Sequence, residues 1–147
     1  MNFEKSEEIV ENSPLYVLKI DKDYRITYAN ETFFTDFEYE RESVIGLNAE
    51  EMGITPENYH KWYMYYDKVF ESGERETFET KIEGKKGTQF FKFYLIPLFD
   101  ASRTVVSITL YLTDITSSKL IEDERDYIFN FSLDMFAIQT LQGDRLL

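Results

Sequence analysis

The stretch TQFFKFYLIPLF, residues 88–99, is apolar on both sides of an extended chain. Because the side chains of a strand alternate between the two faces of a sheet, this stretch presents two apolar rows. One row is Phe91, Phe93, Leu95, Pro97 and Phe99, and the other is Phe90, Tyr94, Ile96 and Leu98, with only Lys92 as an interruption. Such a strand needs cover on both faces. The pattern therefore predicts a strand within a sheet, with helices on one face and further cover on the other.

Four more segments have the composition of strands. Residues 75–83 and 104–113 flank the apolar stretch, and Gly84-Lys85-Lys86-Gly87 predicts a tight turn before it. In residues 104–113 the predicted inner face is Val106, Ile108, Leu110 and Leu112. Earlier, LYVLKID and RITYA form a predicted hairpin. We expect an α+β fold with a five-stranded antiparallel sheet, two strands before the helices and three after, and helices packed on one face.

Capping residues mark where the predicted helices begin and end. Asn30 precedes ETFFTDF, where its side chain can accept a bond from the first free amides of a helix. Pro56 and Gly73 predict a longer helix over residues 56–72. Flanking helices are predicted at both ends: an amphipathic cap helix within residues 1–13 and a helix over residues 117–131. The latter has a short coiled-coil pattern, with pairs seven residues apart at Leu120 and Tyr127 and at Ile121 and Ile128.

Charge and composition limit the partners. The chain has 28 acidic and 16 basic residues, a formal net charge of −12. Phosphate backbones and anionic lipids repel such a surface, so we expect no nucleic-acid partner and no membrane contact from this segment. The absence of cysteine excludes disulfides, thiolate metal ligands and a thiol nucleophile. No signal peptide or membrane-spanning run is present in the sequence, which predicts a cytoplasmic location.

Residues 9–116 contain a series of short motifs that follow the order of these elements. They are ENSP, LKIDKDYRITYANETF, VIG, ESGE, the GKKG hairpin, Pro97 late in the fourth strand, and DIT at 114–116. Together, in this order and at these spacings, they resemble the PAS family of sensory domains. The sequence departs from the family at Lys86, where Asp is usual, and at DASRT, which lacks the customary Gly. The resemblance implies a non-catalytic PAS/PAC sensory module of a larger signal-transduction protein, such as the sensor histidine kinase of a two-component system.

The end of the chain repeats its beginning. Residues 128–147 resemble residues 9–26, with Ser132 aligned on Ser13. Internal similarity of this kind indicates an array of domains. The predicted organisation is a cap helix at 1–13, a PAS domain at 14–116, an output or linker helix at 117–131, and the start of a second, truncated PAS domain at 132–147.

The resemblance also implies an internal pocket between the sheet and the helices. On the 56–72 helix, Tyr59, Tyr63, Tyr66 and Phe70 fall within about 60° of one another. The candidate pocket residues are Phe33, Phe37, Tyr59, Tyr63, Tyr66, Phe70, Phe78, Phe91, Phe93 and Leu110. A small organic ligand could occupy such a pocket. The alternative is that these side chains form a filled aromatic core in a ligand-free dimerisation or linker module.

The histidine and cysteine content of the chain limits which cofactors it can bind. His60 is the only histidine, and the helical wheel places it about 120° from the centre of the aromatic stripe. Trp62 aligns with the iron ligand of haem-binding members, so haem is not expected. Without cysteine the adduct chemistry of the light-sensing flavin branch is excluded, whereas a non-covalent flavin is left open.

Catalytic and metal sites are not expected. Asp21-Lys22-Asp23 begins like a calcium loop, but Ile26 and Thr32 occupy the positions of its Gly and Glu. No histidine or paired carboxylate falls on the predicted inner faces, so this segment is predicted not to be an enzyme.

The last strand and the outward row carry the remaining predictions. The resemblance places Asp114, Ile115 and Thr116 where the sheet is joined to the output helix, so these residues are candidates for signal transmission. The predicted partners are a second copy of the chain and adjacent domains of the same parent. The candidate dimer surface is Phe90, Tyr94, Ile96, Leu98, Ile121 and Ile128.

Overall fold

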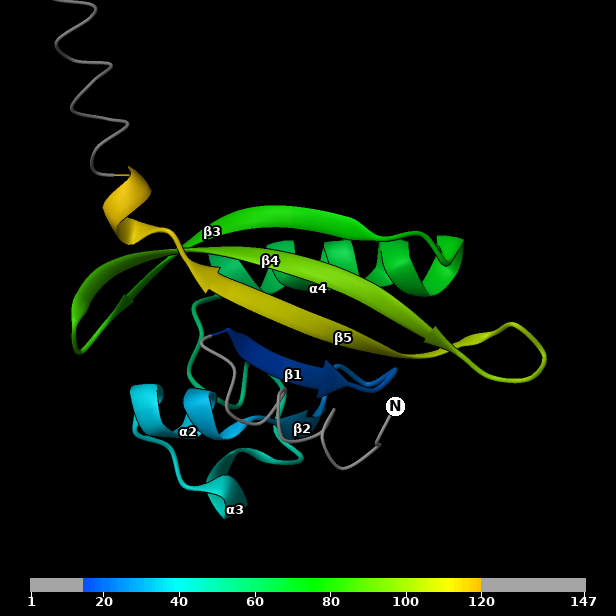
Figure 1. The fold of residues 1–147 in the computed structure, drawn as a ribbon, viewed down its shortest axis with the longest axis horizontal. Helices are drawn as coiled ribbons and strands as arrows, with labels where there is room; N and C mark the ends of the chain where they lie inside the picture. Colours follow the sequence, from blue (N-terminus) through cyan, green and yellow to red (C-terminus); the bar gives the residue numbers. More distant parts are fainter. Residues whose placement is uncertain (1–14, 120–147) are drawn as a thin grey trace, which may run out of the picture. The chain divides into compact units, whose positions relative to one another are not determined.

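A five-stranded antiparallel sheet forms the centre of the fold (Figure 1). The computed structural model of the protein describes residues 15–119. The strands are β1 (Tyr16–Ile20), β2 (Ile26–Ala29), β3 (Glu76–Gly84), β4 (Gly87–Phe99) and β5 (Val105–Asp114), in the order β2-β1-β5-β4-β3. Every neighbouring pair is antiparallel. The predicted α+β class and the predicted sheet are confirmed.

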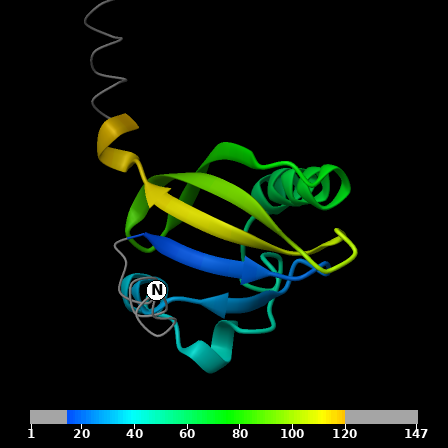
Figure 2. The same cartoon turned by 45° about the vertical axis from the view of Figure 1, so that its right-hand side comes forward.

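Three helices lie between β2 and β3 in the chain. They are α2 (Glu31–Phe37), α3 (Arg41–Val44) and α4 (Pro56–Ser72). Helix α4 packs against β3, β4 and β5, and α2 packs against β1. Figures 1 and 2 show α4 running along the long strands, whereas α2 and α3 lie beside β1 and β2. None of the helices in residues 15–119 is long and apolar enough to cross a membrane.

The two faces of β4 differ in exposure. Phe91, Phe93 and Leu95 point into the core and are at most 2% exposed. Of the outward row, Tyr94 is 37% and Leu98 39% exposed. The inner row is therefore the one that holds the helices on the sheet.

The alternation of inward and outward side chains along β5 shifts by one residue near the turn between β4 and β5. Leu98 pairs with Ser107, but Phe99 pairs with Val105, so β5 contains one extra residue at this point. As a result Val105 is buried whereas Val106 is 41% exposed. The prediction that Val106 faces inward was wrong, because a β-bulge turns the following side chain to the other face.

Gly73 ends α4 and also accommodates the end of β4. Its backbone has φ of 70°, the left-handed conformation that glycine adopts without steric cost. A Cβ atom here would lie 3.2 Å from the ring of Phe99. The residue thus fixes both the end of the helix and its close approach to the sheet.

Residues 116–119 form a helical turn in which the Lys119 amide donates to the Ile115 carbonyl at 2.8 Å. Several predictions lie outside the described residues. These are the cap helix at 1–13, the output helix beyond residue 119, the second PAS domain at 132–147, and the dimer-surface candidates Ile121 and Ile128.

Candidate functional site

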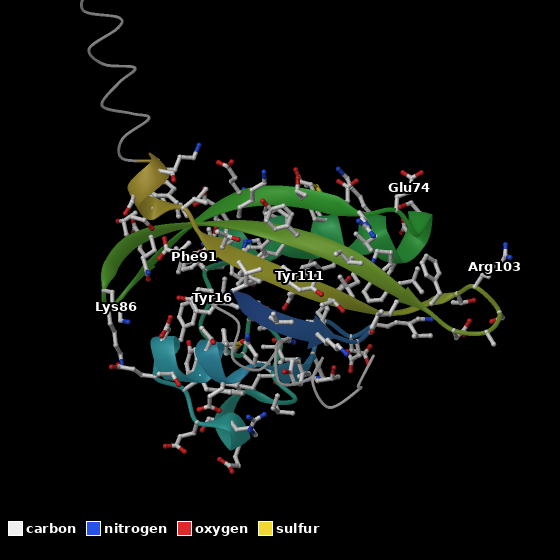
Figure 3. All side chains as sticks on the ribbon, in the orientation of Figure 1. Tyr16, Glu74, Lys86, Phe91, Arg103 and Tyr111 are labelled. Atoms are coloured by element: carbon white, nitrogen blue, oxygen red, sulfur yellow. The ribbon has the colours of Figure 1, made fainter. Side chains whose placement is uncertain are left out.

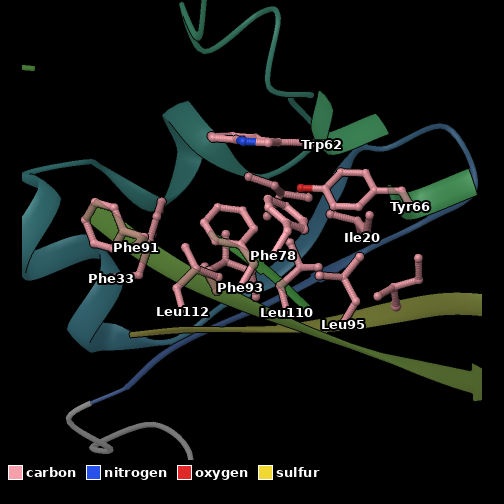
Figure 4. Packing of buried hydrophobic residues seen from close by; sticks show 14 of the residues in the cluster. Ile20, Phe33, Trp62, Tyr66, Phe78, Phe91, Phe93, Leu95, Leu110 and Leu112 are labelled. Atoms are coloured by element: carbon pink, nitrogen blue, oxygen red, sulfur yellow. The ribbon is translucent and has the colours of Figure 1, made fainter. Parts of the chain in front are cut away.

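A cavity of about 490 Å³ lies between the inner face of the sheet and the elements that cover it. Its sheet wall is made by aliphatic and aromatic side chains of β1, β2, β4 and β5, namely Leu18, Ile20, Ile26, Phe93, Leu110 and Leu112. The opposite wall comes from α2, α4 and the loop between α3 and α4, through Phe33, Phe37, Trp62, Tyr66, Ala49, Met52 and Ile54. Figure 4 shows several of these side chains arranged around the space beside Trp62. The deep part of the cavity is therefore apolar.

Trp62 is held in one orientation by a chain of hydrogen bonds. Its indole Nε1 donates to Thr80 Oγ1 at 2.9 Å, and Thr80 Oγ1 donates to Asn58 Oδ1 at 3.2 Å. The side chain is 5% exposed, and its ring centroid lies 5.0 Å from that of Phe93. A buried indole with its N–H satisfied presents a fixed flat wall to the cavity.

Tyr66 brings a polar atom to the same space. The residue is 3% exposed, and Figure 4 shows its hydroxyl directed toward the side of Trp62. Burial raises the pKa of this hydroxyl far above its ordinary value, so it stays protonated. The hydroxyl makes no hydrogen bond to any group of residues 15–119.

Tyr24 joins the turn between β1 and β2 to α4. Its ring stacks on Tyr63, with centroids 4.2 Å apart, and its hydroxyl donates to Asp67. The bond to the Asp67 carboxylate, together with burial, raises the pKa of Tyr24 to about 12. Tyr24 lines the cavity, and its stacking on α4 closes this side of the wall.

Charged side chains gather at the other end of the cavity. Asp36, Glu38, Glu83, Lys85 and Lys86 line it there, and all of them are exposed. Lys86 Nζ donates to the Asp36 carbonyl oxygen at 2.9 Å, so the hairpin turn between β3 and β4 is tied to the end of α2. Figure 3 shows the Lys86 side chain extending from the hairpin toward this helix. Lys86, where the family usually has Asp, thus borders the mouth of the cavity.

Tyr16 provides a second contact near the mouth. Its hydroxyl donates to Asp36 Oδ2 at 2.7 Å. Burial, with the bond to Asp36 as a further cause, raises the pKa of Tyr16 above its ordinary value. The end of α2 is therefore bonded both to β1 and to the β3–β4 hairpin.

The predicted pocket residues divide into two groups. Five lie on the cavity wall: Phe33, Phe37, Tyr66, Phe93 and Leu110. The other five, Tyr59, Tyr63, Phe70, Phe78 and Phe91, do not line it. Phe78 instead packs between Tyr65 and Phe93, with centroid distances of 4.6 Å and 4.8 Å. Phe91 packs against Tyr16 and Phe37.

The face of α4 that is buried differs from the predicted aromatic stripe. Its buried residues are Trp62, Tyr66 and Val69. Their spacing of four and then three residues is itself the signature of one helical face, so this stripe could have been read from the sequence. Tyr59, Tyr63 and Phe70 lie at its edge and are half-buried. Trp62 and Tyr24 are among the wall residues that sequence reasoning missed as cavity residues.

His60 is exposed and contacts the ring of Tyr59 at a centroid distance of 4.6 Å. It does not line the cavity. This agrees with the solvated position that the helical wheel predicts. Within residues 15–119, no three histidine, aspartate or glutamate side chains converge as a metal site requires.

A hydrogen bond connects the cavity wall to the end of β5. Gln89 lines the cavity, and its Nε2 donates to Asp114 Oδ2 at 3.2 Å. Asp114 is the last residue of β5 and is in register with Phe91. Ile115 and Thr116 follow directly and begin the next helical turn. Asp114, the first of the candidate transmission residues, is therefore one side-chain contact away from the cavity.

The outward row of β4 forms a partly exposed apolar surface. Phe90 and Ile96 are half-buried, whereas Tyr94 and Leu98 are exposed. Tyr94 is in register with Tyr111 of β5 and with Thr77 of β3. These dimer-surface candidates thus share one face of the sheet, opposite the cavity.

Comparison with known proteins agrees with this architecture. A family described as the PAS fold matches residues 10–120. No curated protein matches the chain significantly. Among solved structures, the PAS domain of a protein from Colwellia psychrerythraea has a TM-score of 0.67 at 16% identity, covering 78% of this chain and 97% of that chain.

Two further structures have the same fold. A sensory box sensor histidine kinase from Vibrio cholerae has a TM-score of 0.58 at 19% identity, over 76% of this chain and 90% of that chain. The VqmA–ligand–DNA complex from Vibrio cholera has a TM-score of 0.68 at 18% identity, over 78% of this chain and 52% of that chain. These identities show the fold alone. Because the matching family spans more than half of the sequence, the chain belongs to the PAS family.

Proposed function

We propose that this PAS module binds a small organic ligand in its cavity and transmits the effect through Asp114, Ile115 and Thr116 to the chain that follows. The observation that supports ligand binding is the apolar cavity of about 490 Å³. Pockets of this size, with apolar walls and few polar groups, are typical of small-molecule sites. The module is sensory and non-catalytic, and its parent is a larger signalling protein of the sensor-kinase type, as in the similar structure from Vibrio cholerae.

Dimerisation is a second role with its own support. The outward row of Phe90, Tyr94, Ile96 and Leu98 is too apolar to favour full hydration, so a second copy or an adjacent domain is the proposed partner. A ligand-free linker with a filled core is the competing function, and the cavity counts against it. Native mass spectrometry and an absorbance spectrum of the purified protein distinguish them, because a retained ligand adds mass or a visible band.

The proposed ligand is organic, and haem is not proposed. The only histidine is exposed and away from the cavity wall, and the chain has no cysteine. We also propose that this segment does not bind nucleic acid itself, because its net charge of −12 opposes phosphate. The likeness to a protein solved with DNA does not count against this, since the chain spans only 52% of that protein.

Naphthalene is a suitable first probe of the cavity, because dry apolar cavities bind small aromatic molecules. Trp62 is the only tryptophan, so its indole N–H gives a single NMR resonance that reports on the wall. We expect naphthalene to shift this resonance in a saturable manner. Leu112→Phe, which adds volume to the wall, should weaken naphthalene binding and change the free energy of unfolding by less than about 1.5 kcal/mol.

Leu95→Phe is the matched control for that variant. Leu95 lies on the same inner face, is fully buried, and does not line the cavity. The larger side chain has no space there, so we expect a loss of about 1–3 kcal/mol from overpacking. Equal destabilisation by the two substitutions in urea unfolding would show that the space beside Leu112 is already filled, and the ligand-binding proposal would fail.

Transmission is expected to depend on Gln89. Its side chain connects the cavity wall to Asp114, the first residue of the proposed transmission segment. In the wild type we expect bound naphthalene to shift the backbone amide resonances of residues 114–119. Gln89→Leu should leave the Trp62 shift intact and remove most of the shifts at 114–119, because leucine cannot donate to the carboxylate.

Thr88→Val controls for a change at the neighbouring position. Thr88 is exposed and points to the opposite face of β4 from Gln89. We expect this variant to respond to naphthalene as the wild type does. If Gln89→Leu also leaves the shifts at 114–119 unchanged, the contact with Asp114 does not carry the signal.

A further inference from the structure

The buried part of the cavity wall has no charged side chain. The charged residues that line the cavity are Asp36, Glu38, Glu83, Lys85 and Lys86, and every one of them is exposed at the end formed by α2 and the β3–β4 hairpin. An ionised group carried into the apolar part would lose its hydration without gaining an opposite charge, at a large cost in free energy. The deep cavity therefore selects against charged molecules.

The Tyr66 hydroxyl is the polar group that the deep wall leaves without a protein partner. Trp62 Nε1 donates a hydrogen bond to Thr80, and the Tyr24 hydroxyl donates one to Asp67. The Tyr66 hydroxyl has no partner among residues 15–119, although the residue is 3% exposed and lines the cavity. No buried side-chain oxygen or nitrogen of residues 15–119 lacks a hydrogen-bond partner, so the unbonded Tyr66 oxygen is open to the space of the cavity. The missing partner is thus expected to come from what occupies the cavity.

The shape of the wall next to Tyr66 favours a flat molecule. The Trp62 indole is fixed by its bond to Thr80, and Phe33 and Phe93 lie on the wall with it. Aromatic faces pack best against other flat rings, in offset or tilted arrangements. The volume of about 490 Å³ corresponds to about sixteen water molecules, so the space admits a molecule of one or two fused rings with substituents.

We propose that the occupant is a flat, uncharged and largely apolar molecule with a hydrogen-bond acceptor that receives the Tyr66 hydroxyl proton. This inference rests on the proposed ligand-binding function and adds the chemical class of the ligand. The acceptor is a carbonyl oxygen or an unprotonated ring nitrogen. Tyr66 fixes the orientation of the molecule, and Trp62 provides the surface on which its ring packs.

Three probes of similar shape test the proposal: naphthalene, quinoline and 2-naphthoate. They are titrated by calorimetry at slightly alkaline pH, where the quinoline nitrogen is unprotonated and tyrosines stay neutral. Quinoline differs from naphthalene by one acceptor nitrogen. It should bind the wild type about two- to tenfold more tightly, the range expected for one hydrogen bond. 2-Naphthoate, which carries an ionised carboxylate, should bind most weakly of the three.

Tyr66→Phe should reverse the preference between the two neutral probes. Without the hydroxyl, the quinoline nitrogen would be buried with no donor, so naphthalene should become the tighter ligand. Tyr65→Phe makes the same chemical change on α4 at a residue off the cavity wall, and it should keep the wild-type order. The Trp62 indole resonance verifies in each variant that the probe occupies the cavity.

The possible results separate this inference from the function on which it rests. If naphthalene and quinoline bind equally well and Tyr66→Phe has no effect, the cavity binds ligands but the role of Tyr66 is refuted. If 2-naphthoate binds best, the ligand is an anion that reaches Lys85 or Lys86, and the uncharged class is refuted. If none of the probes binds the wild type, both the ligand-binding function and the inference fail.

Discussion

Replacing Phe91 with alanine is expected to lower the free energy of unfolding by about 3–5 kcal/mol. The side chain is fully buried, and its ring packs against Tyr16 at 6.2 Å and Phe37 at 5.8 Å. Truncation removes the apolar contacts and leaves a void next to a sheet that cannot collapse freely. The measurement is urea unfolding followed by circular dichroism. The free energies of unfolding are compared with the same dependence on urea concentration for the wild type and the variant.

Phe99→Ala is the control for this variant. Phe99 lies on the same strand but is 51% exposed, so we expect its truncation to cost about 1 kcal/mol. The comparison separates burial from residue type, because both substitutions remove the same ring. A loss at Phe91 no larger than the loss at Phe99 would contradict the position of Phe91 in the core.

Phe91 also lies close to the elements that the proposed sensory function uses. It does not line the cavity, but it is in register with Asp114 at the end of β5. Its packing against Tyr16 and Phe37 joins the sheet to α2, the helix that borders the cavity mouth. The residue was predicted as a pocket residue, and the structure places it in the packed cluster between the mouth and the strand end.

The strand alternation was a reliable guide wherever the pairing is regular. It placed Phe91, Phe93 and Leu95 on the inner face, and all three are buried. It failed at Val106, because the register shift between Leu98 and Phe99 adds a residue to β5. A bulge has no strong signal in a sequence without an adjacent Gly, since it depends on how the partner strand ends.

The bounds of α4 were predicted correctly, but its buried face was not. Pro56 and Gly73 mark the ends through backbone conformation, which is a local property. Which face is buried depends on how the helix packs against the sheet. In the helix sequence PENYHKWYMYYDKVFES, aromatic residues occupy nearly every side. Tyrosine is compatible with both burial and exposure, so its spacing alone favours no face. Trp62, Tyr66 and Val69 are spaced as one helical face, but the stripe of Tyr59, Tyr63, Tyr66 and Phe70 fits the helical period as well, and the structure buries the first of these two faces.

The mouth of the cavity and the opposite side, which Tyr24 closes, could not be predicted, because each joins segments that are distant in the sequence. Lys86 bonds to the Asp36 carbonyl, and Tyr24 stacks on Tyr63. Both contacts depend on positions of turns relative to helices. Loops lack the periodicity that identifies core residues, so the contribution of Ala49, Met52 and Ile54 to the wall was also not foreseen.

Asn30→Ala is expected to lower the free energy of unfolding by about 3 kcal/mol. Asn30 is fully buried, and its Oδ1 accepts from the amides of Phe33 at 3.3 Å and Val17 at 3.2 Å. Its Nδ2 donates to the Leu15 carbonyl at 2.9 Å. Alanine removes the cap of α2, and it leaves the buried Val17 amide of β1 and the Leu15 carbonyl without this partner, so several penalties add. Urea unfolding measures the loss, and amide exchange at Val17 should accelerate.

Asn48→Ala separates this effect from the loss of an ordinary asparagine cap. Asn48 Oδ1 accepts only from the Glu51 amide, at 2.8 Å, in an exposed turn. We expect that variant to lose about 1 kcal/mol, because water can replace the bond. Similar losses at the two positions would mean that Asn30 acts only as a helix cap. A larger loss at Asn30 would show that one side chain ties β1 to α2, and that the wall formed by Phe33 and Phe37 owes its position to that link.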